Sequence, residues 1–168
     1  MYGPFVKNAL ADELGMQLNM TALVVLTKLY LPGMVAAKSG KILNMASTAA
    51  FQPGPFMALY YATKAFALSF SEAIASELEG TGVTLTALCR GPAATGFQAR
   101  TKLENSRLIK QKKVMDARTV AEAGYRALMA GKPVAIPGLL NKLLAQSVRF
   151  SPRSIVTKIA RKMQEEIN

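Results

Sequence analysis

The sequence of 168 residues contains no histidine and a single cysteine, Cys89. Without histidine the chain cannot build a Ser-His-Asp triad, a Cys-His pair or an HExxH zinc site. One cysteine also excludes an internal disulfide and a cysteine-cluster zinc site, so we predict no metal centre. Because Cys89 stands in an apolar segment, we expect its thiol to be buried and inert. Few residue types remain for acid–base chemistry near neutral pH, which favours tyrosine and lysine.

Long uninterrupted apolar runs are also missing. None reaches the roughly 18 residues that a transmembrane helix needs, and the longest, 20–35, is interrupted by Lys28 and by Pro32-Gly33. The first residues lack the basic and apolar regions of a secretory signal. With 51% hydrophobic and 18% charged residues, the composition is that of a globular protein rather than a disordered one. We therefore expect one folded domain in the cytoplasm.

The net charge of +11 is unevenly distributed. Residues 1–99 contain six Lys and Arg against five Asp and Glu, whereas residues 100–168 contain fifteen against five. Such a basic segment is typical of contact with nucleic acid, an anionic membrane or a phosphorylated ligand. It is equally typical of a solvated surface.

Hydrophobic periodicity predicts an α/β fold. We expect helices over residues 8–37, 57–78, 116–130, 139–150 and 154–167, and strands over residues 41–46, 83–89 and 133–136. The first helix is expected to start near Asn8 or Asp12, and Pro32 predicts a kink or break in it. Asp116 and Gly131 are expected to cap the helix over 116–130. Two strands on either side of a long helix form a βαβ unit, so the sheet should be parallel.

Two segments allow more than one interpretation. Residues 98–113 are polar and basic, and could form a flap or short helices. Residues 139–167 carry apolar stripes bordered by Lys and Arg. This last segment could lie on a membrane surface, or pack on the domain or on a partner.

The segment from Ser47 to Lys64 contains the strongest chemical signal. Ser47 follows a predicted strand, and Tyr60 and Lys64 lie four residues apart on the next helix, so they project from one face. A free tyrosine has a pKa of about 10. A lysine about 4 Å away stabilises the phenolate by about 4 kcal/mol at an effective dielectric near 20, but by about 1 kcal/mol in water. The pair would therefore act only in a partly desolvated cleft. An exposed surface pair without function is the alternative.

A second candidate segment follows the strand over 83–89. Gly91 and Pro92 shape a loop just beyond the strand's carboxyl end, where α/β sheets bind their ligands, and Thr95 is available to bond a ligand amide. A simple strand-to-helix loop is the alternative.

Together these residues resemble the C-terminal two-thirds of a short-chain dehydrogenase/reductase. The matching motifs are Ile42-Leu-Asn-Met-Ala-Ser47, Tyr60-x-Ala-Thr-Lys64 and Gly91-Pro-x-x-Thr95, and Asn19 stands 28 residues before Ser47. The resemblance covers residues 1–137 and implies a partial Rossmann-like parallel sheet made of its last three strands. Residues 138–168 would be a basic amphipathic helical extension of the same domain.

The resemblance implies an oxidoreductase that interconverts a carbonyl and an alcohol with NAD or NADP. Tyr60 would be the general acid or base, and Lys64 would lower its pKa and hold the nicotinamide ribose. Ser47 would orient the substrate oxygen, and Asn19 would support a proton-relay water. Gly91, Pro92 and Thr95 would hold the nicotinamide carboxamide.

The sequence departs from the family pattern in two places. Arg90 stands where the family usually has proline, and no glycine-rich dinucleotide turn occurs anywhere in the chain. We therefore expect a truncated chain with an exposed strand edge at residues 41–46. Its binding of NAD or NADP would be weak or absent, since the main phosphate contact is lost.

These departures leave a second functional hypothesis open. The chain would then be a non-catalytic remnant that acts as a dimerisation or interaction module. In either case we expect a homo-oligomer formed through helices 8–37 and 57–80. No aromatic-interleaved basic patch supports nucleic-acid binding. Peripheral membrane contact would involve residues 139–167.

Overall fold

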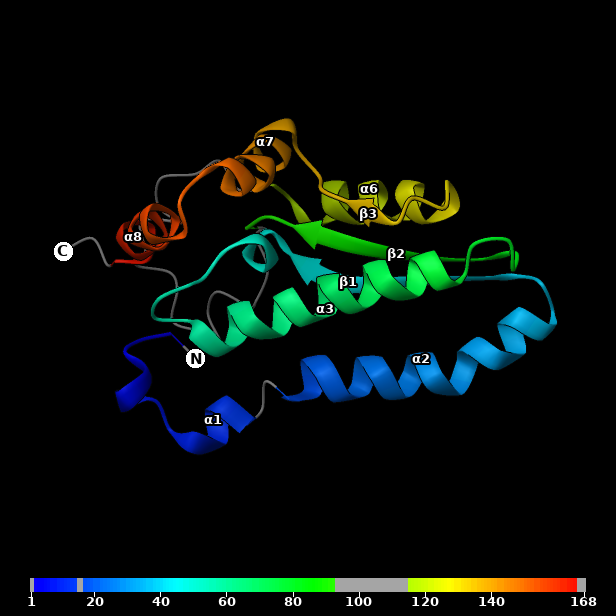
Figure 1. Cartoon of the computed structure of the whole chain (residues 1–168), viewed down its shortest axis with the longest axis horizontal. Helices are drawn as coiled ribbons and strands as arrows, with labels where there is room; N and C mark the ends of the chain where they lie inside the picture. Colours follow the sequence, from blue (N-terminus) through cyan, green and yellow to red (C-terminus); the bar gives the residue numbers. More distant parts are fainter. Residues whose placement is uncertain (1, 15–16, 93–114, 166–168) are drawn as a thin grey trace.

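The computed structural model describes residues 2–14, 17–92 and 115–165, and these residues form an α/β fold around a parallel sheet. The sheet contains strands β1 (Gly40–Ser47), β2 (Val83–Arg90) and β3 (Val134–Ala135), in that order. Both pairings are parallel, and the β1–β2 register runs from Gly40 opposite Val83 to Ser47 opposite Arg90. The predicted fold class and all three strands are therefore confirmed (Figure 1).

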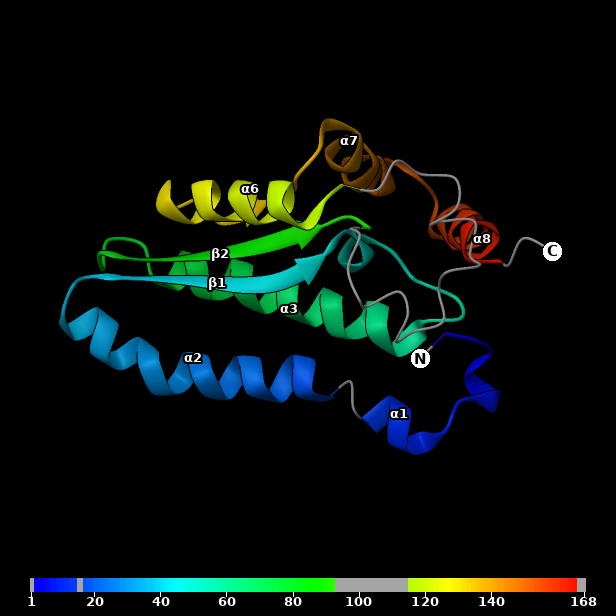
Figure 2. The same ribbon diagram turned by 180° about the vertical axis from the view of Figure 1, so that it is seen from behind.

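Helices cover both faces of the sheet. Helix α3 (Ala58–Glu77) packs on one face, with helix α2 (Leu18–Ala36) beside it, and helix α6 (Ala117–Met129) packs on the other (Figures 1 and 2). Alternating residues of β2 explain this arrangement, since successive side chains point to opposite faces. Ala87 and Cys89 form one apolar cluster with Leu68 of α3, whereas Leu88 packs against Val120 of α6.

The N-terminal helix is shorter and more divided than predicted. In place of one helix over 8–37, the described residues form a 3₁₀ turn at Phe5–Lys7, the short helix α1 (Leu10–Leu14) and then α2. Pro32 lies inside α2 and does not end it. Figure 1 shows the helix bending towards its C-terminal end, which agrees with the predicted kink, because proline removes one backbone hydrogen bond.

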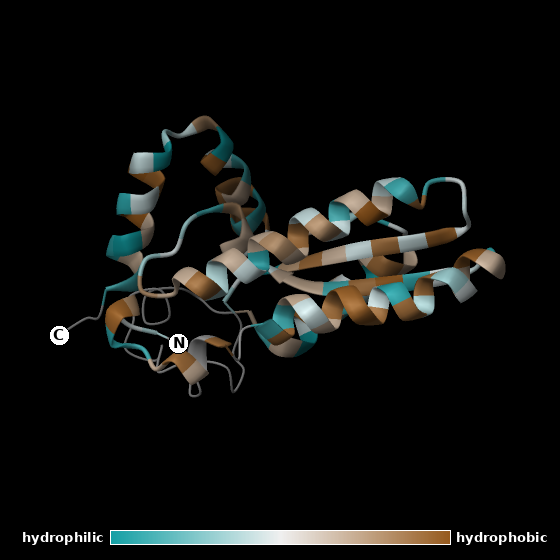
Figure 3. Ribbon diagram, turned by 60° about the horizontal axis from the view of Figure 1, so that its bottom comes forward, coloured by the Kyte–Doolittle hydropathy of each residue, from teal (hydrophilic) through white to brown (hydrophobic). Residues whose placement is uncertain are grey.

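The expectation that no apolar run is long enough for a transmembrane helix is wrong for α2, because Lys28 and Pro32 do not interrupt this helix. By length and composition it is able to cross a membrane, and only 6% of it is buried in the structure. Near its C-terminal end, Leu31 and Met34 pack against the cluster around Leu78. Figure 3 shows hydrophobic residues along the long helices as well as on the strands, and Val25, Leu29 and Tyr30 of α2 are exposed. A helix that packs against another protein has the same composition, so this finding alone does not assign the chain to a membrane.

The remaining helices lie as the sequence predicts, with small shifts at their ends. Asp116 caps α6 by accepting a hydrogen bond from the Thr119 backbone N–H at 2.9 Å, and Gly131 follows the helix with a φ of 64°. Helix α7 (Leu139–Ser147), a 3₁₀ turn (Val148–Phe150) and helix α8 (Arg153–Gln164) lie beyond the carboxyl ends of the strands (Figure 1). The predicted flap at 98–113 lies outside the described residues.

Candidate active site

Ser47 is the last residue of β1 and caps the 3₁₀ helix η3 (Thr48–Phe51) that follows. Its Oγ accepts a hydrogen bond from the Ala49 backbone N–H at 3.1 Å and donates one to the Arg90 carbonyl at 3.3 Å. The first bond is a normal cap, and the second is long for a hydroxyl donor. The serine is thus fixed where the strand ends, while its proton is held loosely.

Tyr60 lies in the first turn of α3 and is 8% exposed. A buried hydrogen bond aligns this helix with the sheet, because Asn44 Nδ2 on β1 donates to Ser71 Oγ on α3 at 2.9 Å. The Ser71 hydroxyl in turn donates to the Ala67 carbonyl at 2.6 Å. This Asn44–Ser71 contact, which sequence reasoning missed, fixes the rotation of α3 and so directs Tyr60 towards the end of the sheet.

Lys64 lies one helical turn after Tyr60, with its ammonium nitrogen 5.9 Å from the centre of the Tyr60 ring. The same nitrogen donates a hydrogen bond to the Met45 carbonyl at 2.8 Å. Burial lowers the pKa of Lys64 to about 8; the neighbouring Arg90 charge lowers it further, and Cys89 opposes the shift. The predicted juxtaposition of Tyr60 and Lys64 is therefore present, in a partly desolvated position.

This shift predicts a pH-dependent stability. Between about pH 8 and 10.5, Lys64 binds fewer protons in the folded chain than in the unfolded one, so the free energy of unfolding should rise with pH across that window. Below pH 8 both states are protonated and the contribution is constant. Urea unfolding at a series of pH values should show this rise for the wild type relative to Lys64→Met. Lys64→Arg should lack it, because a guanidinium does not titrate there. Parallel curves for wild type and Lys64→Arg would contradict the prediction.

Asn19 reaches the site through an intermediate residue. Its Nδ2 lies 3.4 Å from Thr63 Oγ1, and Thr63 Oγ1 donates to the Tyr60 carbonyl at 2.9 Å. Thr63 belongs to α3, is fully buried and faces Asn19 of α2. Asn19 therefore contacts the backbone of the Tyr60 turn indirectly.

Gly91 and Pro92 follow β2 and line the same cavity as Ser47 and Tyr60. Gly91 is closely packed, since a Cβ there would lie 2.6 Å from Asn141 Nδ2. Arg90 also lines this cavity. It stands at the position where the family that the sequence resembles usually has proline. Thr95 lies outside the described residues.

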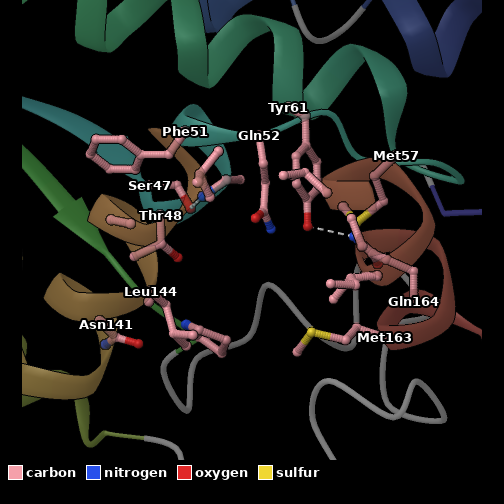
Figure 4. Close-up of a pocket in the computed structure, with 18 of the residues that line it drawn as sticks. Ser47, Thr48, Phe51, Gln52, Met57, Tyr61, Asn141, Leu144, Met163 and Gln164 are labelled. Carbon is pink, nitrogen blue, oxygen red and sulfur yellow. Dashed lines mark hydrogen bonds between the residues drawn. The ribbon is translucent and has the colours of Figure 1, made fainter. Parts of the chain in front are cut away.

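The cavity, with a volume of about 240 Å³, extends from the carboxyl ends of the strands to the C-terminal helices. Its walls are mostly apolar, and α7 and α8 contribute Leu144, Val156, Ile159, Ala160 and Met163. Figure 4 shows Ser47 and Thr48 on one side of the cavity and Tyr61 and Gln164 on the other. Asn19 and Lys64 do not line it. The C-terminal segment, for which the sequence left several roles open, therefore forms a wall of the candidate site.

Tyr61 is a further residue that sequence reasoning missed. It is 8% exposed, and its ring centre lies 6.0 Å from that of Tyr60 in an edge-to-face arrangement. Burial, together with the neighbouring Tyr60, raises the pKa of Tyr61 to about 12, although hydrogen bonds with Gln164 and Gln52 lower it. The hydroxyl of Tyr61 is therefore neutral at physiological pH. Its position directly after Tyr60 is the only signal for it in the sequence.

Gly54 supports the position of Tyr61. A Cβ at residue 54 would lie 2.2 Å from Cδ2 of the Tyr61 ring. We expect Gly54→Ala to lower the free energy of unfolding by about 1–3 kcal/mol, because the ring must move within a packed wall. Gly33→Ala is the matched control, since nothing lies within 4 Å of its added Cβ. Equal urea midpoints for the two variants would show that the ring is not packed against Gly54.

Comparisons with known proteins identify the family of this chain. A family model described as short chain dehydrogenase matches residues 7–106. The chain is 32% identical over 161 residues to the ketoacyl reductase HetN of a Nostoc species, covering 91% of this chain and 55% of that protein. It is 31% identical over 155 residues to a very-long-chain 3-oxoacyl-CoA reductase of Pyrenophora tritici-repentis, covering 89% of this chain and 45% of that protein. The chain thus spans about half the length of these relatives.

Solved structures give the same result. A short-chain dehydrogenase from Sphingobium yanoikuyae in complex with NADPH superposes with a TM-score of 0.75 at 25% identity, covering 91% of this chain and 62% of that one. A 7beta-hydroxysteroid dehydrogenase superposes with a TM-score of 0.77 at 21% identity, covering 95% and 62%. The second likeness supports the fold alone.

Proposed function

Because the chain belongs to the short-chain dehydrogenase family, we propose that it interconverts a carbonyl and an alcohol with NAD or NADP. One observation carries the proposal. Ser47 and Tyr60 line one cavity beyond the carboxyl ends of the strands, and the Lys64 ammonium lies 5.9 Å from the Tyr60 ring. Ser47 and Tyr60 therefore border one cavity where α/β folds bind ligands, and the positive charge of Lys64 lies beside the Tyr60 ring, outside the cavity lining.

In this proposal Tyr60 transfers a proton to the carbonyl oxygen during reduction, and accepts it from the alcohol during oxidation. Ser47 holds the same oxygen, since its hydroxyl proton is engaged only in a long bond to Arg90. The Lys64 charge stabilises the phenolate that Tyr60 leaves behind. Asn19 acts as a positioning residue through Thr63. Deprotonation of Lys64 near pH 8 would remove its charge, so the rate should decline above that pH.

The described residues fit only one end of the cofactor. Lys64 uses one of its three donors on Met45, which leaves two for ribose hydroxyls. Tyr60, whose ring lies 5.9 Å from the Lys64 nitrogen, lines the cavity together with Gly91 and Pro92, and Thr95 is expected to join them. A nicotinamide cofactor supplies or accepts hydride when bound. The glycine-rich turn that holds pyrophosphate in the family does not occur in this sequence, so we propose that this chain alone binds NAD or NADP weakly.

The cavity and the relatives suggest a substrate class. The names of the two curated relatives describe ketoacyl and 3-oxoacyl-CoA reductases. The largely apolar walls of the cavity suit a ketone attached to a hydrocarbon chain. We therefore propose an apolar ketone or its alcohol as the substrate.

Titration with NADPH and NADH, followed by nicotinamide fluorescence, tests the proposal. We expect a weak but saturable signal that is reduced in Lys64→Met, together with NADPH-dependent reduction of a medium-chain ketone. Absence of any binding at millimolar cofactor would overturn catalysis by this chain alone. It would favour the non-catalytic alternative.

That alternative rests on the exposed apolar surface of α2, where Leu29 and Tyr30 are 69% and 63% exposed. Here the chain would act by association, through α2 and α3. Sedimentation velocity of the wild type and of Leu29→Glu would test this association. The two proposals differ in outcome, because only the catalytic one requires cofactor binding.

We also propose that residues 138–168 belong to the same domain as residues 1–137. In support, α8 lines the cavity together with α3, and the Tyr2 hydroxyl donates to the Gln164 carbonyl. Peripheral membrane contact through 139–167 and the cytoplasmic location stay predictions. Co-sedimentation with anionic liposomes, with and without residues 139–168, would test the first of these.

A further inference from the structure

Three uncharged polar side chains, Gln52, Tyr61 and Gln164, lie next to one another along the wall of the cavity that leads away from Ser47. Gln164 Nε2 donates to the Tyr61 hydroxyl at 2.6 Å, and Gln52 is the second hydrogen-bond partner of that hydroxyl. All three residues line the cavity, and Figure 4 shows Gln164 on the side away from Ser47, with Gln52 between Ser47 and Tyr61. We refer to Gln52, Tyr61 and Gln164 as the amide cluster.

The amide cluster is incomplete. Gln164 is 1% exposed, yet its Oε1 has no hydrogen-bond partner among the described residues. A buried acceptor without a donor is destabilising, and each such group in a native protein calls for an explanation, such as a bound water, an ion or a ligand. The neighbouring apolar wall, which includes Met163 and Ile159, supplies no donor. Because Gln164 Oε1 is itself closed to water, a ligand with a hydrogen-bond donor would complete the cluster after a small displacement of the Gln164 side chain.

The donor on that ligand should be uncharged. Among the described residues that line the cavity, Arg90 is the only charged one. It is the last residue of β2 and pairs with Ser47, the last residue of β1. None of these described lining residues is a carboxylate that could balance a cationic donor, and burial of an unpaired charge is strongly unfavourable. A hydroxyl group meets the requirement.

We propose that the amide cluster is a second recognition point for the substrate. It would select apolar carbonyl or alcohol compounds that carry a hydroxyl group at the end remote from the reacting carbon. This inference rests on the proposed function for the position of the reacting carbon. Its physical basis is the spatial separation of Ser47 and Gln164 across an apolar cavity.

Ligand binding can test the proposal without turnover. Alkane-1,n-diols of six to twelve carbons, in steps of two, would be compared with 1-alkanols of equal length by isothermal titration or ligand-observed NMR. At the matching length we expect the diol to bind about 3- to 10-fold more tightly, which corresponds to one net hydrogen bond. If the wild type bound each diol and the 1-alkanol of the same length with equal affinity at every length, the proposal would be overturned.

Two further comparisons identify the contact. The ω-methoxy alcohol accepts hydrogen bonds at its far end but cannot donate, so it should lose the advantage of the diol; equal binding of ether and diol would overturn the donor assignment. Gln164→Met should abolish the diol preference while retaining 1-alkanol binding. Met163→Leu is the matched control on the same helix and should keep the preference. Loss of the preference in Met163→Leu but not in Gln164→Met would contradict the proposal.

Failure of this inference can be told apart from failure of the proposed function. A diol preference without NADPH-dependent turnover would retain the amide cluster and remove the catalytic proposal. NADPH-dependent turnover without a diol preference would retain the catalytic proposal and remove the amide cluster as a recognition point.

Discussion

Replacing Tyr60 by phenylalanine should reduce the rate of NADPH-dependent ketone reduction by about 10²- to 10⁴-fold, the usual contribution of a positioned general acid. The phenolic hydroxyl is the only group removed, and the ring that fills the buried position in the first turn of α3 is retained. We therefore expect the free energy of unfolding to change little. Initial rates with a medium-chain ketone, measured alongside urea unfolding, check both parts of this prediction.

Tyr61→Phe is a closely matched control. Tyr61 is the next residue, is 8% exposed like Tyr60, and also lines the cavity. Burial raises the pKa of Tyr61 to about 12, so its hydroxyl is poorly suited to transfer a proton near neutral pH. With a medium-chain ketone that has no second hydroxyl group for the amide cluster to bind, this variant should keep most of its rate. If Tyr61→Phe lost as much activity as Tyr60→Phe, the assignment of Tyr60 as the proton donor would be wrong.

The largest expected effect on stability is that of Gly82→Ala. Gly82 connects the end of α3 to β2 with a φ of +82°, and an added Cβ would lie 2.2 Å from the Lys38 carbonyl oxygen. A left-handed conformation costs an alanine about 1–2 kcal/mol. The clash should add about 1–3 kcal/mol, because the obstructing atom belongs to the backbone and cannot turn away. Together these costs form a large fraction of the roughly 5–15 kcal/mol typical of a folded domain.

Gly80→Ala separates the two contributions. Gly80 has a similar φ of +78°, but nothing lies within 4 Å of its added Cβ. Its substitution should therefore show only the conformational cost. The difference between the two free energies of unfolding, measured in urea, isolates the clash with Lys38. Equal values would mean that the α2–β1 and α3–β2 junctions are not in contact.

The order of the elements can be predicted from the sequence because it depends on local patterns. The periodicity predicts a helix over 57–78, and α3 lies at Ala58–Glu77, since its apolar residues recur at helical spacing. Asp116 is predicted as a cap and accepts the Thr119 N–H. The four-residue spacing of Tyr60 and Lys64 is sufficient to place them on one face of a helix. By contrast, the single helix predicted over 8–37 appears among the described residues as two elements, α1 at Leu10–Leu14 and α2 at Leu18–Ala36, and the periodicity does not indicate this division.

What the sequence determined by itself is the chemistry that the chain carries. It has no histidine and contains Ser47, Tyr60 and Lys64 in the family order, on a strand end and on the following helix of a parallel sheet. Only the tertiary structure decided that α8 forms a wall of the cavity and that Gln164 bonds to Tyr61, 103 positions earlier. Periodicity indicates which side of a helix is buried but not which surface will cover it. That choice depends on the packing of the whole chain, and here it brings the C-terminal helices to the carboxyl ends of the strands.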